Sequence, residues 1–266
     1  MSKLYKLTSS LNRYALCVTN LSLVNFLKIA YFHFFGDGRI IRLNTKNFNE
    51  IYYRSNGDIG VLAHFFTAQT GFVFKSPYEM KTIFDLGANI GIETIRMKKM
   101  FPDSKIISVE LEKENFKLLQ KNTKALKNVE TINKAIWNSV RQVGVTQKNS
   151  WDNQTFSATH NYSKRKIETV TIDGLMKDYN ISNINLLKID IEGAEQIIFD
   201  KSCDNWIANV DIIMMECPDE GAPFTTQKIF EAFGRNALTM NTYVNGENII
   251  FCKKGIDVIP KSVDLY

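Results

Sequence analysis

Two glycines four residues apart follow a carboxylate in the segment 82–91. The apolar residues before Asp85 predict a strand, and residues 92–100 after the turn predict a helix. Gly87 and Gly91 let the backbone approach a ligand closely, because glycine has no side chain and tolerates a positive φ. The free N–H groups at the start of the helix then face the turn. The segment therefore predicts a binding turn at the carboxyl end of a strand.

A second acid, Glu110, ends the next apolar run, residues 106–109. It lies 19 residues after Gly91. At this spacing, the acid that binds the ribose hydroxyls ends the second strand of a nucleotide-binding βαβ unit. The turn and the acid together predict a pocket for a cofactor that carries a nucleoside.

The residues within the turn indicate which cofactor this is. A dinucleotide site requires a central glycine where the pyrophosphate passes, and this chain has Asn89 at that position. Asp85 would repel a pyrophosphate, but it can accept hydrogen bonds from the ammonium group of an amino acid. The pattern therefore favours S-adenosylmethionine (SAM) over NAD, with a nicotinamide-dependent oxidoreductase as the alternative.

Length and composition are those of a single α/β domain with an N-terminal extension. The chain has 266 residues and a net charge of +5, distributed in short clusters without interleaved aromatic residues, so nucleic acid is not an expected partner. Its four cysteines have neither metal-ligand nor disulfide spacing, which indicates a reduced, cytoplasmic protein. We expect an extension at 1–78 packed on the core, a cofactor domain at 79–254 and a tail at 255–266.

The N-terminal residues 14–35 are fairly apolar but are interrupted by Asn20, Asn25, Lys28 and His33. Such a segment is a poor membrane span, because polar groups inside a bilayer are costly. It predicts an amphipathic helix that packs on the domain, with peripheral contact to a membrane surface as the alternative.

Strands and helices are expected to alternate from residue 83 onward, the pattern of a parallel sheet covered on both faces. The turn Asn245-Gly246 predicts a terminal hairpin. The predicted fold is therefore a Rossmann-like class I SAM-methyltransferase fold: a mostly parallel seven-stranded sheet that ends in an antiparallel hairpin. Expected strands are 39–43, 50–53, 82–86, 105–110, 129–134, 168–172, 185–191, 211–215, 237–244 and 248–253, and expected helices are 58–69, 113–126 and 194–199.

Several blocks of the chain resemble the FkbM-type methyltransferases over roughly residues 39–252. The most specific is 187–195, with Lys188, Asp190, Glu192 and Glu195. The others are 83–91, 109–110 with 114–119, 135–138, 171–175 (taken as a short strand and acidic turn), 213–216, and upstream Tyr53-Arg54 with Gly57-Asp58.

The resemblance implies transfer of a methyl group from SAM to a hydroxyl oxygen of a small molecule, commonly a sugar, a glycan precursor of surface polysaccharide or a secondary metabolite. Methylation of nucleic acid or protein is the alternative within the same fold. Ligands of an open parallel sheet lie at the carboxyl ends of its strands. The expected cofactor-binding residues are Asp85, Gly87, Ala88, Asn89, Gly91, Glu110, Leu111, Ala135, Ile136 and Asp190.

Acids at the ends of the fourth and fifth strands are the candidates for catalysis: Asp190, Glu192 and Glu216. Together they could act as base, position a hydroxyl or hold a divalent cation, and we assign no metal ligands. Glu195 could instead complement a helix dipole. The polar insert 140–167 is expected to form a flap over the acceptor site, with His160 as an outside candidate for the base.

Overall fold

We describe the protein from a computed structural model, which describes residues 24, 27–29, 31, 35, 37–45, 49–55, 57–58, 60–62, 74–75, 79–147, 156–159, 165–216, 223–245, 248–256 and 259–260. The expected segments 14–35 and 58–69 fall largely outside these residues, and His160 falls wholly outside them. Within the described part of the chain, no helix combines the length and apolar character needed to cross a membrane.

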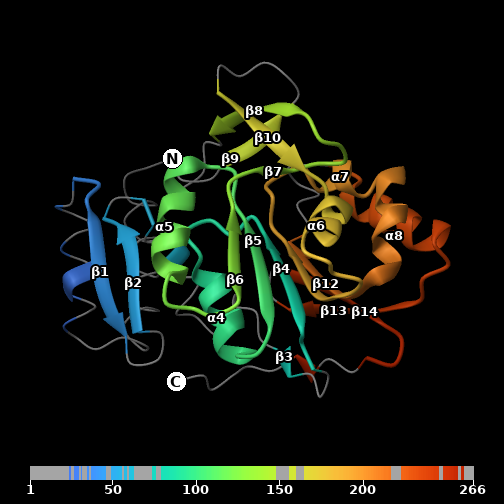
Figure 1. Cartoon of the computed structure of the whole chain (residues 1–266), viewed down its shortest axis with the longest axis horizontal. Helices are drawn as coiled ribbons and strands as arrows, with labels where there is room; N and C mark the ends of the chain where they lie inside the picture. Colours follow the sequence, from blue (N-terminus) through green and yellow to red (C-terminus); the bar gives the residue numbers. More distant parts are fainter. Residues whose placement is uncertain are drawn as a thin grey trace, which may run out of the picture.

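A seven-stranded sheet forms the centre of the molecule (Figure 1). Its strands are apolar runs, and β11 (Ile184–Ile189) is buried at every residue because both of its faces are covered. The strand order is β13-β14-β12-β11-β4-β5-β6, and within it only β14 runs antiparallel to its neighbours. The predicted fold class is confirmed. The other strands are β4 (Thr82–Leu86), β5 (Lys105–Val109), β6 (Val129–Ile132), β12 (Val210–Glu216), β13 (Met240–Asn245) and β14 (Asn248–Lys253).

Helices follow most of the parallel strands, as crossover connections require. They are α4 (Ile92–Met100), α5 (Lys113–Thr123), α6 (Ile172–Asp178), α7 (Glu195–Ile198) and α8 (Thr225–Arg235), with 3₁₀ turns at Lys201–Asn205 and Ile207–Asn209.

The interpretation of 171–175 as a short strand and turn was wrong. The Thr171 side chain accepts a hydrogen bond from the Gly174 N–H at 3.0 Å and so caps α6, which begins there.

The N-terminal strand pair β1 (Ile40–Thr45) and β2 (Asn49–Arg54) is antiparallel and lies beside α5 (Figure 1). Its buried side chains, including Leu43 and Ile51, share a hydrophobic cluster with Ile95 of α4 and Leu118 of α5. The predicted pairing of two short strands is confirmed, and this pair packs against α4 and α5.

The insert between β6 and α6 forms a second, four-stranded sheet at the top of Figure 1, ordered β7-β10-β8-β9. Ala158 of β9 reaches the main pocket, so part of the insert does lie over the site. The strands are β7 (Ala135–Ile136), β8 (Gln142–Gln147), β9 (Phe156–Thr159) and β10 (Lys166–Val170); a further pair, β3 (Phe74–Lys75) and β15 (Ile259–Pro260), lies at the opposite end of the molecule.

Candidate functional site

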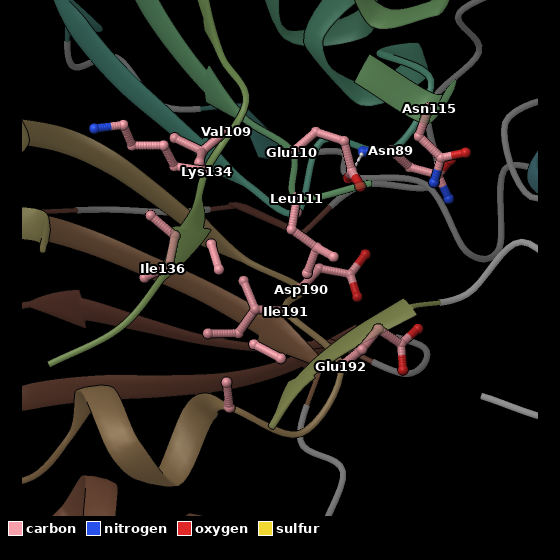
Figure 2. Close-up of a pocket in the computed structure, with 14 residues that line it drawn as sticks. Asn89, Val109, Glu110, Leu111, Asn115, Lys134, Ile136, Asp190, Ile191 and Glu192 are labelled. Atoms are coloured by element: carbon pink, nitrogen blue, oxygen red, sulfur yellow. Dashed lines mark hydrogen bonds between the residues drawn. The ribbon is translucent and has the colours of Figure 1, made fainter. Parts of the chain in front are cut away.

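A pocket of about 560 Å³, including the open solvent at its mouth, lies at the carboxyl ends of β4, β5 and β11 (Figure 2). These are the strand ends at which the sequence predicted a cofactor site. The pocket is lined by Gly87, Asn89, Val109, Glu110, Leu111, Asn115, Lys134, Ala135, Ile136, Ala158, Asp190, Ile191, Glu192 and Ala194.

Glu110 directly follows β5 and is 6% exposed. One carboxylate oxygen accepts the Asn89 N–H at 2.8 Å and the other accepts the Glu112 N–H at 2.7 Å. Burial raises the pKa of Glu110 to about 7, although these backbone hydrogen bonds oppose the rise. A carboxylate has about four acceptor positions, and the Asn115 side chain also donates to this one, so a position remains for a hydroxyl group of a ligand.

Asn89 occupies the position where a dinucleotide site needs glycine. Its backbone is left-handed, with a φ of 49°, a conformation that asparagine tolerates better than most residues. Its Oδ1 is buried without a hydrogen-bond partner, while its backbone N–H is bound to Glu110. A buried acceptor without a partner at the pocket wall is a position that a ligand donor can satisfy.

Gly87 is held against the loop that follows β11. A Cβ atom added at Gly87 would lie 1.7 Å from the Asp190 carbonyl oxygen, and the φ of Gly87 is +81°. Both facts exclude any other residue. The sequence predicted a close approach of this backbone to a ligand; the close approach in the structure is between the loops after β4 and β11.

Three of the predicted cofactor-binding residues do not line the pocket: Asp85, Ala88 and Gly91. A Cβ atom at Gly91 would lie 2.7 Å from Leu119 Cδ1, so this glycine allows α4 to pack on α5. Ala88 is 4% exposed, and its N–H is bound to the Val109 carbonyl at 2.9 Å.

Asp85 lies beneath the pocket, fully buried. Its Oδ1 is 3.3 Å from Lys188 Nζ, and its Oδ2 accepts the Thr94 hydroxyl at 2.6 Å. Lys188 is also 3.3 Å from Asp190 Oδ2. Burial alone would lower the pKa of Lys188, but Asp190 and Asp85 together raise it, so the amine is charged.

Asp190 and Glu192 reach the pocket, as predicted, from the loop after β11 (Figure 2). The Asp190 side chain is 39% exposed. Glu216 does not join them: it is exposed at the end of β12 and is not among the lining residues. The three acids that were expected to converge therefore do not all line this pocket.

Glu195 has a structural position. Its two oxygens accept the Ile191 N–H at 3.2 Å and the Gly193 N–H at 2.7 Å. It thereby holds the loop that carries Glu192. Burial raises the pKa of Glu195. Within the described residues, no group of three or more His, Cys, Asp or Glu side chains is arranged to hold a metal ion.

Six lining residues were not predicted: Val109, Asn115, Lys134, Ala158, Ile191 and Ala194. Val109, Ile191 and Ala194 are chain neighbours, within two residues, of the predicted Glu110, Asp190 and Glu192. Asn115 lies in the block 114–119, which resembles the family. This resemblance was the sequence signal that could have identified it as a lining residue. Lys134 precedes β7, and Figure 2 shows its amine pointing away from the acids; it is 3.3 Å from Glu168. No sequence pattern identified Ala158 as a lining residue, because only the folding of the insert brings it to the pocket.

Comparisons with known proteins add a curated relative and several solved structures. "Methyltransferase 1" of Beauveria bassiana (strain ARSEF 2860) is 29% identical over 170 residues, covering 55% of this chain and 68% of that protein. Aeropyrum pernix fibrillarin with natively bound SAM has a TM-score of 0.41 at 13% identity, covering 81% of each chain. A putative caffeoyl-CoA O-methyltransferase from Staphylococcus aureus has a TM-score of 0.41 at 10% identity, covering 65% of this chain and 76% of that one. Structural similarities this low carry no argument about substrate.

The family comparison agrees with the blocks found in the sequence. The model of the methyltransferase FkbM domain matches residues 85–236, more than half of the chain. The matched region contains the turn after β4, Glu110 and the acidic loop after β11. The chain therefore belongs to the FkbM methyltransferase family and is a SAM-dependent methyltransferase.

Proposed function

We propose that the protein methylates a hydroxyl oxygen of a small molecule, a sugar or glycan precursor. The observation that carries this proposal is the pair Asp190 and Glu192, whose carboxylates line the same pocket as Glu110. Carboxylates bind hydroxyl groups well, because they accept strong hydrogen bonds from them. One of them can also receive the proton that a hydroxyl must lose when it is methylated.

The residues present fit SAM. Glu110 would accept hydrogen bonds from the ribose hydroxyls, and the partnerless Asn89 Oδ1 would accept one from a donor of the cofactor. Leu111, Ala135 and Ile136 line the pocket and would pack against the adenine.

The charge of the pocket supports the same choice. Its described lining carries three carboxyl groups, Glu110, Asp190 and Glu192, and one amine, Lys134, which pairs with Glu168. Acidic walls suit a cofactor with a sulfonium and an ammonium group. They would repel a dinucleotide pyrophosphate and a nucleic-acid backbone.

SAM supplies an electrophilic methyl group, so the protein has only to position the acceptor oxygen and remove its proton. The partial exposure of Asp190 in the pocket and its bond with Lys188 support it as the group for the second task. Methyl transfer would form the O–CH₃ bond and break the S–CH₃ bond, and the hydroxyl proton would pass to Asp190 and then to water. Holding the reactants in line can account for much of the rate.

The test is a transfer assay with a panel of nucleotide sugars and free glycans, with S-adenosylhomocysteine as the readout. NMR of the product then shows whether the methyl group is on oxygen, nitrogen or carbon. We expect an O-methyl signal and SAM-dependent product. Methyl transfer to protein or nucleic acid from a lysate, with none to the glycans, would overturn the proposed acceptor class.

A further inference from the structure

The strand β2 is joined to α5 by two side-chain amides on one face of the helix. Asn122 Oδ1 accepts the Tyr52 N–H at 2.7 Å, and its Nδ2 donates to the Tyr52 carbonyl at 3.0 Å. Asn115 lies seven residues earlier, which is two helical turns, and accepts Arg54 Nη2 at 2.6 Å. Asn115 also lines the cofactor pocket, so the second junction connects β2 to the site.

The position of Arg54 is itself fixed. Its Nε and Nη2 donate to the Asp58 carboxylate at 3.0 and 2.7 Å, and Asp58 Oδ2 accepts the Arg54 N–H at 2.7 Å. The two side chains are 12% and 0% exposed, so water does not replace these bonds readily. A guanidinium held by two parallel bonds has little freedom to move.

This geometry determines which way the Asn115 amide points. A guanidinium can only donate hydrogen bonds, so Asn115 must turn its oxygen toward Arg54. Its NH₂ group, which can only donate hydrogen bonds, then points away from Arg54. A hydrogen bond from the Asn115 side chain lowers the pKa of Glu110, in opposition to the burial that raises it.

We propose that Arg54 is a positioning residue of the cofactor pocket, which orients Asn115 so that its NH₂ group donates to the Glu110 carboxylate. The inference rests on the proposed role of Glu110 in binding the ribose of SAM. Arg54 and Asp58 lie outside the FkbM-matched region 85–236. The N-terminal strand pair therefore contributes to cofactor binding without contacting the cofactor.

Other charged groups surround Glu110 and must stay unchanged in a test. Glu112, which follows it in the chain, raises the pKa of Glu110 and is itself bound by Arg165 of the insert at 2.7 Å. The remaining charged residues of the pocket lining are Lys134, Asp190 and Glu192.

The test uses Asn115→Ala, Arg54→Lys and the control Asn122→Ala. Lysine keeps the charge beside Asp58 but lacks the fork that reaches both Asp58 and Asn115. Asn122→Ala loosens the same strand from the same helix face and leaves the bond between Arg54 and Asn115 in place, although it also removes the bond from Asn122 Nδ2 to the Ile90 carbonyl at 2.7 Å. The Glu110 carboxyl is titrated by ¹³C NMR without SAM, and SAM affinity is measured by calorimetry at pH 6.5 and 8.5.

In the wild type we expect Glu110 to titrate at about 7. Loss of the Asn115 donor should raise this midpoint, so SAM affinity should fall more at pH 6.5 than at pH 8.5. For each rise of about one unit, the ionised fraction of Glu110 falls about eightfold at pH 6.5 and less than twofold at pH 8.5. Arg54→Lys should shift both quantities in the same direction by a smaller amount. Asn122→Ala should lower thermal stability and shift the Glu110 midpoint less than Arg54→Lys does, because its bonds reach Tyr52 and Ile90 but not Asn115.

An unchanged Glu110 midpoint in Arg54→Lys would overturn the inference, as would an equal shift in Asn122→Ala. Absence of SAM binding by the wild type would overturn the proposed role of Glu110. The NMR titration decides the link from Arg54 to Glu110 separately, because it requires no cofactor.

Discussion

Glu110 and Asp190 both follow parallel strands that end at the same edge of the sheet, yet their surroundings differ. Glu110 is buried, and each of its oxygens accepts a backbone N–H. Asp190 is 39% exposed and is held by the amine of Lys188. The first arrangement suits tight binding of a fixed group, and the second suits contact with a substrate that enters and leaves. Position at a strand end therefore does not decide the role of an acid; its partners do.

The largest effect is expected at Gly87, where the loop after β4 contacts the loop that carries Asp190. Gly87→Ala places a Cβ atom 1.7 Å from the Asp190 carbonyl oxygen at a φ of +81°. Because that atom belongs to the backbone, one of the loops must move, and we expect a loss of ~4 kcal/mol or more in the free energy of unfolding. Urea unfolding measures this. Gly91→Ala is the matched control, since it has a similar φ of +86° but its nearest contact is the movable tip of Leu119. Equal losses would show that backbone strain, not the close approach of the loops, is the cause.

Asp190→Asn should reduce kcat while leaving SAM affinity nearly unchanged. It removes the proton acceptor but keeps the shape of the side chain, so kcat should fall by about 10²- to 10⁴-fold. SAM affinity should change by less than about threefold, because Glu110, the acid proposed to bind the ribose, is untouched. Steady-state kinetics and calorimetry measure the two quantities. A variant with near wild-type kcat would rule out Asp190 as the base.

Glu110→Gln should affect SAM binding, in contrast to Asp190→Asn, which should affect kcat. We expect SAM affinity at pH 8 to fall at least about tenfold, or ~1.4 kcal/mol, because a neutral amide is a weaker acceptor for ribose hydroxyls. In the wild type, affinity should fall as the pH drops below about 7, where Glu110 becomes protonated. Calorimetry between pH 6 and 8.5 measures both effects. A pH-dependent affinity that persists in the variant would assign the titration to another group.

Glu110→Gln should raise the free energy of unfolding at pH 8, although it weakens SAM binding. The pKa of Glu110 is raised from 4.5 to about 7, so its contribution to stability is present at low pH and is lost as the pH rises through 7. The buried charge therefore costs about 3 kcal/mol at pH 8. Glu110→Gln removes this charge, and its free energy of unfolding at pH 8 should exceed that of the wild type. A less stable variant would mean that the two backbone hydrogen bonds outweigh the cost of burial.

The smallest effect is expected at Glu216, which is exposed and lies outside the lining. Glu216→Gln should change kcat and SAM affinity by less than about twofold and stability by about 0.5 kcal/mol or less. The same assays apply. A loss of kcat comparable to that of Asp190→Asn would restore the three-acid arrangement that the sequence suggested.

The sequence by itself determined the fold class and most of the cofactor side of the pocket. Those signals are local: apolar runs predict the strands, and the turn from Asp85 to Gly91 and the placement of Glu110 after the next strand follow from chain spacing. Asn245-Gly246 likewise predicted the terminal hairpin, which the structure contains as β13 and β14. Features within one βαβ unit or one hairpin can be predicted because few residues separate their parts.

Only the tertiary structure decided which distant residues become partners. Lys188 lies directly opposite Asp85 in the parallel pairing of β11 with β4, which turns the predicted ligand of the methionine end into a buried ion pair. Arg54 meets Asn115 across 61 residues, and the insert brings Ala158 to the pocket. Such contacts depend on strand register and on packing between elements, which are set by the whole core and not by local spacing.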